Sequence, residues 1–171
     1  MIVQWLRTSV YSSGVLLLVR LYLGYTWITS GWGKITSEES FSAMGLLGRA
    51  VENPSVQGWW LSFLNGFAIP NVGLFNVMVP WGEFFVGLGL ILGTFTTFSA
   101  LMGITMNFAF MFSGSTGVNP QMVLLTVFVI AAGSNAGRFG IDNYLLPYVQ
   151  KFMPNLKVNE DKRPQVSGSK L

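Results

Sequence analysis

The chain has 171 residues, of which 51% are hydrophobic and 10% are charged, and its formal net charge is +3. Soluble proteins average about 25% charged residues, so the composition excludes an ordinary soluble domain and predicts an integral membrane protein. The sequence contains no cysteine and no histidine. This excludes disulfides, thiol redox relays, Cys/His zinc sites and haem held by histidine, so any redox chemistry needs a diffusible or borrowed cofactor.

Four apolar segments reach the length that a membrane-spanning helix needs, roughly 17 to 25 residues, although the last two are short. Glycine- and asparagine-rich turns separate the last three, which predicts sequential antiparallel neighbours. We therefore predict an all-α integral membrane four-helix bundle in one domain over residues 1–153, followed by a polar, disordered tail over 154–171. The predicted spans are residues 12–31, 72–92, 97–114 and 120–135.

The first segment has a competing interpretation as a secretory signal peptide, because Arg7 precedes an apolar run. Arg20 interrupts that run, and no small-x-small cleavage pattern follows at a suitable distance. These two features favour an uncleaved first helix.

The long loop between the first and second spans, residues 32–71, contains its own amphipathic pattern. Helical spacing places Phe41, Met44, Leu47 and Val51 on one face, and interfacial aromatics such as Trp59 follow. We predict that this loop lies on the bundle as an amphipathic lid.

The distribution of lysine and arginine predicts the orientation in the membrane. The long loop carries both signs of charge, whereas the N-terminus carries Arg7 and the segment after the last span is rich in cations. Both termini are therefore expected in the cytoplasm, with the long loop and the 113–120 turn outside. The cations after the last span are Arg138, Lys151, Lys157, Lys162, Arg163 and Lys170.

Two predicted spans each contain one charged residue, Arg20 in the first and Glu83 in the second. A charge near the bilayer centre costs about 2.5 to 3.5 kcal/mol on insertion scales, so such residues are usually paired or functional. At 1.5 Å per residue, Arg20 would lie about 16 Å and Glu83 about 13 Å below the outer surface, so the two can meet. We expect a polar pocket in the outer half of the bundle, lined by Arg20, Glu83, Asn107, Gln121, Trp27 and Lys34.

Each of these residues also has a purely structural interpretation. An Arg20–Glu83 pair can serve packing alone. Asn107 can bridge helices, and Lys34 can extend to the lipid phosphates. For Trp32, a place in the aromatic belt at the headgroup level is the simpler interpretation.

Several short motifs together resemble the DoxX/DoxD family of small four-helix membrane proteins over roughly residues 15–145. They are Arg20-Leu21 with Gly24, Gly31-Trp32 with Lys34-Ile35, Glu83 with Gly87, Leu90 and Gly93, Asn119-Pro120, and the segment from Gly137 to Asp142. The resemblance implies site roles for Arg20, Lys34, Glu83, Arg138 and Asp142. It also implies a plasma membrane protein of a bacterium or an archaeon and, by similarity to the membrane subunit of thiosulfate:quinone oxidoreductase, a role with quinones.

The pocket residues are chemically compatible with a quinone, which needs hydrogen-bond donors, a proton carrier and aromatic walls. Arg20 and Glu83 are the candidate catalytic residues. No metal and no nucleic acid is expected, because the acidic residues form no cluster and no nucleotide-binding pattern is present. The candidate binding residues are Trp27, Trp32, Lys34, Asn107 and Gln121.

Three functions remain open from the sequence. The first is a quinone-binding redox protein that acts with a redox partner subunit, which would make this chain a subunit of a quinone-dependent oxidoreductase. The second is a small-molecule or proton-coupled transporter, and the third is an assembly subunit of a membrane complex. Membrane lipid is an expected partner in each case, and the many glycines leave a homo-oligomer open.

Overall fold

The computed structural model describes residues 1–145, and these residues form helices and no strand. The predicted all-α membrane bundle is confirmed. The predicted tail and the cations from Lys151 onward lie outside the described residues. In chain order the elements are α1 (Ile2–Thr8), α2 (Val10–Thr36), α3 (Met44–Glu52), α4 (Gly58–Phe63), η1 (Leu64–Ala68), α5 (Val72–Leu92), α6 (Thr96–Phe112), α7 (Asn119–Ala132) and η2 (Gly133–Gly137).

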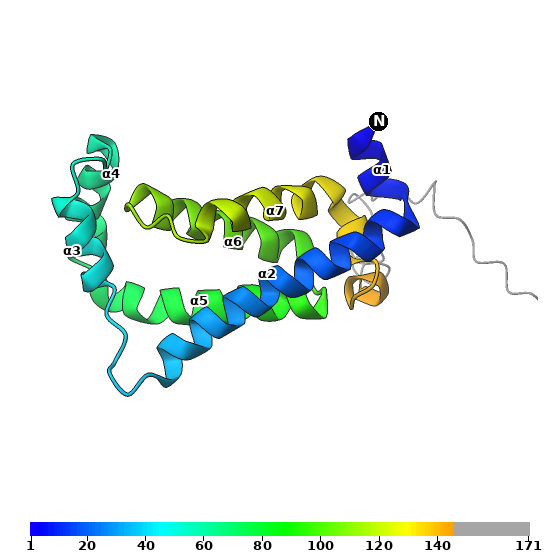
Figure 1. Cartoon of the computed structure of the whole chain (residues 1–171). Coiled ribbons are helices and arrows are strands. Elements are labelled where there is room, and N and C mark those ends of the chain that lie inside the picture. The colour runs from blue at the N-terminus through cyan, green and yellow to red at the C-terminus, as the bar shows by residue number, and fades with distance from the viewer. Residues whose placement is uncertain (146–171) are drawn as a thin grey trace, which may run out of the picture.

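The four long helices α2, α5, α6 and α7 run along one axis, as Figure 1 shows. By length and composition, α5 and the helix Asn119–Gly137, which joins α7 and η2, are able to cross a membrane. Helices α1 and α2 are bent by 85° relative to each other, and they form a third span if the pair is counted as one. Helix α6 is apolar but shorter. The second predicted span has the bounds of α5, whereas α2 extends five residues beyond the predicted end of the first span.

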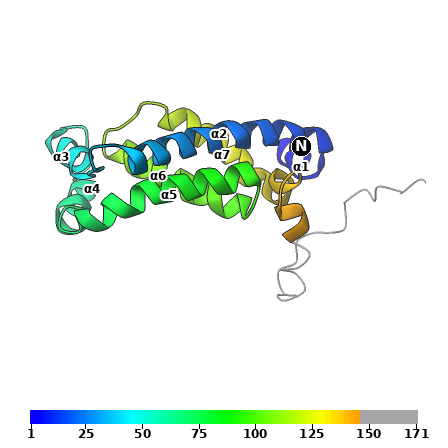
Figure 2. The ribbon, with the colours of Figure 1, turned by 90° about the horizontal axis from the view of Figure 1, so that it is seen from below.

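Short helices lie across both ends of the bundle (Figures 1 and 2). Helix α1 lies at one end, where α2 begins and α5 ends, and we call this the α1 end. Helices α3, α4 and η1 lie at the other end, and we call them the cap and this end the cap end.

Helices α2 and α5 pack closely because glycines face each other across their contact. A Cβ at Gly31 would lie 2.6 Å from the Phe84 backbone nitrogen, and one at Gly87 would lie 2.6 Å from the Gly24 carbonyl oxygen. No side chain fits at that distance, so glycine permits the approach, as small residues generally do between membrane helices. These contacts fix the register of α2 against α5 and thereby the depth of every polar residue on the two helices.

The sharp bend between α1 and α2 is held by a polar group that the sequence analysis did not predict. Asn135 Nδ2 donates hydrogen bonds to the carbonyl oxygens of Leu6 (2.7 Å) and Ser9 (3.0 Å) and to Ser12 Oγ (3.0 Å). The bend therefore leaves its free carbonyl groups satisfied, and it is tied to η2.

The cap has a small apolar core of its own. On α3 the buried residues are Leu47 and Ala50, whereas Met44 and Val51 are exposed, so the predicted apolar face is only partly correct. The difference arises because the helix begins at Met44, and the buried set follows the spacing Ala43, Leu47, Ala50. The full core consists of Ala43, Leu47, Ala50, Val56, Leu64 and Ala68.

Two hydrogen bonds join the cap region to the bundle. The Ala43 backbone N–H donates to Asn76 Oδ1 on α5 at 2.7 Å, and Trp60 Nε1 donates to Ser113 Oγ after α6 at 2.9 Å. The cap thus lies across the ends of the bundle helices, as Figure 2 shows, which agrees with the expected lid.

Candidate functional site

The buried carboxylate of α5 is paired with a lysine of α2. Lys34 Nζ donates to Glu83 Oε2 at 2.5 Å and to Ser30 Oγ at 2.8 Å. Glu83 is only 1% exposed, whereas the Lys34 side chain is 27% exposed. The Glu83 Cβ lies 3.1 Å from where a Cβ of Gly31 would stand, so the absence of a side chain at Gly31 makes room for this acid.

Two further polar side chains of the bundle, on α2 and α6, are buried and lack hydrogen-bond partners. Trp27 is 3% exposed and Asn107 is 0% exposed. Among residues 1–145, the Trp27 Nε1, Asn107 Nδ2 and Asn107 Oδ1 atoms make no hydrogen bond. An unsatisfied buried polar group costs roughly 1 to 3 kcal/mol, so native proteins retain few of them, and each one needs an explanation.

Helix packing brings these residues to adjacent turns of the bundle. The Trp27 Nε1 atom lies 3.2 Å from where a Cβ of Gly103 would stand, and Gly103 is one helical turn before Asn107 on α6. Gly82, next to Glu83, faces the sulfur of Met106, which precedes Asn107. We call Trp27, Lys34, Glu83 and Asn107 the cap-side site.

Arg20 does not join this site, so the expectation that Arg20 and Glu83 meet is wrong. Arg20 Nη1 donates to the Ala136 carbonyl oxygen at 2.6 Å, at the α1 end. The register of α2 places Glu83 beside Gly31, eleven residues from Arg20, which corresponds to about 16 Å along the helix. The expected depth was wrong because α2 continues to Thr36, and because helical side chains point back toward the helix N-terminus.

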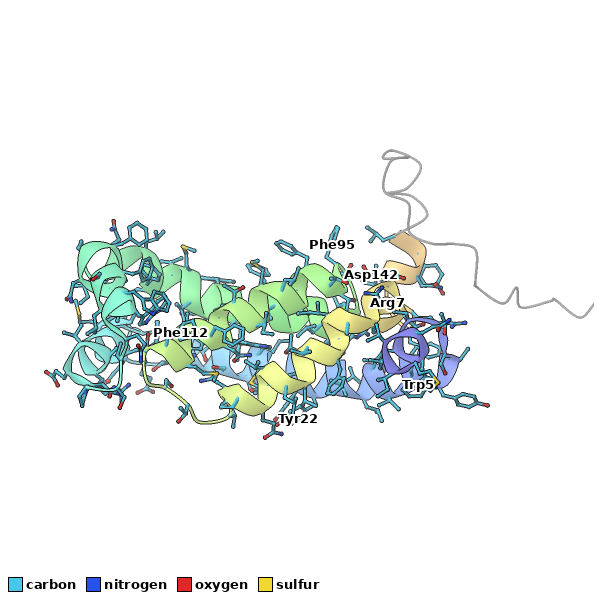
Figure 3. The ribbon with its side chains drawn as sticks, turned by 90° about the horizontal axis from the view of Figure 1, so that it is seen from above. Trp5, Arg7, Tyr22, Phe95, Phe112 and Asp142 are labelled. Atoms are coloured by element: carbon cyan, nitrogen blue, oxygen red, sulfur yellow. The ribbon has the colours of Figure 1, made fainter. Side chains whose placement is uncertain are left out.

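A second polar group forms around Arg20. Asp142 Oδ1 accepts from the Phe95 backbone N–H at 2.6 Å, and its Oδ2 accepts from the Thr96 N–H at 2.8 Å, so this carboxylate caps the start of α6 (Figure 3). The guanidinium lies against Gly93, where a Cβ would stand 2.5 Å from Nη1. We call Arg20, Gly93, Thr96, Ala136 and Asp142 the α1-end cluster.

The capping role of Asp142 was not predicted from the residue pattern. Asp142 is 46 positions beyond the helix that it caps, and capping motifs are recognisable in a sequence only when cap and helix are adjacent. The family resemblance pointed to Asp142 as a residue of interest, without its role.

The structure places the two remaining candidate binding residues at the surface. Trp32 is 52% exposed and its ring packs against Phe84, with 5.8 Å between centroids. Gln121 is exposed and its Nε2 donates to the Tyr22 hydroxyl at 3.1 Å, on the outer face of the bundle where Figure 3 labels Tyr22. The expected single pocket is thus divided, and ligand roles for Trp32 and Gln121 stay predictions.

The cap-side site combines complementary groups, and its Trp27, Glu83 and Asn107 are buried. Trp27 and Asn107 offer N–H donors, Asn107 also offers an acceptor, and Glu83 is a carboxylate that accepts a hydrogen bond from Lys34. Such a set suits a flat ligand with hydrogen-bonding oxygens more than it suits a metal ion, which would need several carboxylate or carbonyl ligands.

Comparison with known proteins agrees with the resemblance read from the sequence. A family model described as DoxX matches residues 15–116, which contain Arg20 and all four residues of the cap-side site and end before Asp142. Neither the curated proteins nor the solved structures gave a match. Since the model matches more than half of the 171 residues, the chain belongs to the DoxX family.

Proposed function

We propose that this membrane protein is redox-associated and binds a quinone, or a similar aromatic small molecule, at the cap-side site. The observation that supports this most is the trio of unpartnered buried atoms, Trp27 Nε1, Asn107 Nδ2 and Asn107 Oδ1. A ligand with carbonyl or hydroxyl oxygens would satisfy them and remove a cost that the fold otherwise bears.

The chemistry of a quinone matches this set of groups. Its ring carbonyls accept hydrogen bonds, and two-electron reduction converts them to hydroxyl groups that also donate. Trp27 and Asn107 would donate to the carbonyl oxygens, and Asn107 Oδ1 would accept from a hydroxyl of the reduced form. Glu83 is the proton carrier, and Trp27 adds an aromatic wall.

Electrons must come from another molecule. The full sequence has no cysteine or histidine to hold a haem or an iron–sulfur cluster. A partner subunit with its own redox centre would therefore supply or accept the electrons. The family resemblance points to such an arrangement, because it likens this chain to the membrane subunit of an oxidoreductase.

We also propose a plasma membrane of a bacterium or archaeon as the location, with both termini in the cytoplasm. The excess of lysine and arginine outside the long loop supports this orientation. The cap and the cap-side site would then face the outer side of the membrane.

A binding titration tests the proposal. A short-chain benzoquinone is added to the protein in mild detergent, and the dissociation constant is measured for wild type, Trp27→Phe and Asn107→Leu. Each variant removes hydrogen-bonding groups and keeps similar bulk, so each should weaken binding by about tenfold, corresponding to about 1.4 kcal/mol. Trp59→Phe and Asn65→Leu change the same residue types at exposed positions and should bind as wild type does.

Equal affinity in all five proteins would show that the quinone binds elsewhere, and no saturable binding to wild type would reject the proposal. A proton-coupled transporter is the second candidate, because the Lys34–Glu83 pair links a buried carboxylate to a partly exposed amine. Flux of a substrate into reconstituted vesicles, without quinone binding, would favour that function.

A further inference from the structure

The Lys34–Glu83 pair runs from the interior of the bundle to its cap end. Glu83 is 1% exposed, and the Lys34 side chain that holds it is 27% exposed. Within residues 1–145, Lys34 is the only charged residue that contacts the Glu83 carboxylate. Lys34 is therefore the residue through which a proton from water can reach Glu83.

Within residues 1–145, helices α5, α6 and α7 contain no titratable residue other than Glu83. Helix α6 brings Met106 and Asn107 to this level, and α2 brings Gly31 and Trp27, none of which titrates near neutral pH. Arg20 lies at the α1 end, bound to Ala136. The surroundings of Glu83 thus favour one direction of proton exchange, toward the cap end.

We infer that Lys34 and Glu83 form a proton relay that connects the cap-end surface to the ligand in the cap-side site. This inference rests on the proposed function, because the ligand must be one that takes up protons with electrons. It adds a role for Lys34 and states that protons enter from the cap end of the bundle. Neither statement follows from quinone binding alone.

The relay can be written so that charges and protons balance. Reduction of a quinone to the quinol would use two electrons from the redox centre of a partner subunit and two protons. Starting from the ion pair, the Lys34 ammonium gives its proton to the Glu83 carboxylate, Glu83 passes this proton to a ring oxygen, and the neutral Lys34 amine takes a proton from water at the cap end. A second cycle delivers the second proton and yields the quinol.

The contacts of Lys34 suit a relay. Its Nζ is held between Glu83 Oε2 and Ser30 Oγ, and it lies 5.7 Å from the centroid of the Phe41 ring. Phe41 precedes the cap, and with this ring beside the amine the Lys34 side chain stays 27% exposed to water. The relay geometry is thus preformed, which general acid catalysis requires.

A Lys34→Arg variant separates the relay from a structural ion pair. Arginine keeps the positive charge beside Glu83, but it does not release its proton near neutral pH. Wild type and Lys34→Arg are loaded with a short-chain benzoquinone on an electrode, and the rate of proton-coupled reduction is measured by voltammetry. The dissociation constant and the thermal midpoint are measured on the same samples, and Arg49→Lys on the exposed face of α3 is the control.

We expect Lys34→Arg to bind the quinone within about threefold of wild type and to reduce it roughly 100-fold more slowly, the lower part of the range for a positioned acid. If Lys34→Arg does not fold, Lys34→Ala provides the same test, because added ethylamine should restore the rate of reduction. An unchanged rate in Lys34→Arg, or no rescue of Lys34→Ala, with binding intact would overturn the relay and leave quinone binding standing. Absence of quinone binding to wild type would remove both.

Discussion

The bundle contains two groups of buried polar residues at different depths, and they differ in which of their side chains bind the backbone. In the α1-end cluster, both carboxylate oxygens of Asp142 and one guanidinium nitrogen of Arg20 bind backbone groups, whereas Arg20 Nε, Arg20 Nη2 and Thr96 Oγ1 have no partner among the described residues. In the cap-side site, the polar atoms of Asn107 and the indole nitrogen of Trp27 bind nothing among the described residues. The bonds of Asp142 and Arg20 to backbone groups stabilise the fold. Trp27 and Asn107 make no such side-chain bond, and their polar atoms remain available to a ligand.

The largest effect is expected at Asp142, where the comparison assigns a structural role. Asp142→Ala removes the acceptor for two backbone N–H groups and leaves Arg20 without its nearby negative charge. A loss of about 3 to 5 kcal/mol is expected, as for other broken buried charge interactions. The measurement is the thermal midpoint in mild detergent, and Glu52→Ala on the exposed face of the cap is the control. A change no larger than that of Glu52→Ala would contradict the structural role.

The next effect tests the ion pair of the cap-side site. Lys34→Met leaves the buried Glu83 carboxylate without its counter-charge, and because Lys34 is partly exposed the expected loss is smaller, about 2 to 3 kcal/mol. The double variant Lys34→Met/Glu83→Gln removes both charges and should recover most of that stability. A double variant as unstable as the sum of its single changes would show that the two residues act independently.

A third prediction concerns the register that keeps the two groups apart. Gly31→Ala places a Cβ 2.6 Å from the backbone of α5 and should cost about 1 to 3 kcal/mol by forcing the helices apart. Gly33→Ala, on the same helix with nothing within 4 Å, should gain up to about 1 kcal/mol from helix propensity. Equal thermal midpoints for the two variants would contradict the close α2–α5 contact.

The smallest effect has the opposite sign. Asn107→Leu replaces an unsatisfied buried amide with an apolar side chain of similar size, and it should raise the stability of the ligand-free protein by about 1 kcal/mol. Asn65→Leu, in an exposed position of η1, should change the thermal midpoint little. A clear loss of stability in Asn107→Leu would mean that Asn107 serves packing between helices instead of ligand binding.

The sequence predicted the helices well because membrane spans have a strong local signal. The bounds of α5 were predicted to the residue, since apolar length and flanking turns define such a helix. The amphipathic pattern of the long loop predicted helical structure there, although the start of α3 shifted its buried face.

The arrangement of the site was harder to predict because it depends on register. Three or four residues of error at a helix end move a side chain by about 5 Å, enough to exchange one partner for another. Glu83 was identified as a buried acid, but its partner is Lys34 instead of Arg20, because Gly24, Gly31 and Gly87 set the helix contact. The Asp142 cap was missed for the same reason, since it depends on a contact between segments far apart in the chain.

The most direct test of quinone binding at the cap-side site is to identify what the protein carries when it is purified. Wild type, Asn107→Leu and Asn65→Leu are isolated in mild detergent, and their extracts are analysed by mass spectrometry for quinones and lipids. We predict a stoichiometric quinone in wild type and Asn65→Leu and its loss from Asn107→Leu. An extract of wild type that holds only bulk phospholipid, or the same amount of quinone in all three proteins, would contradict the account.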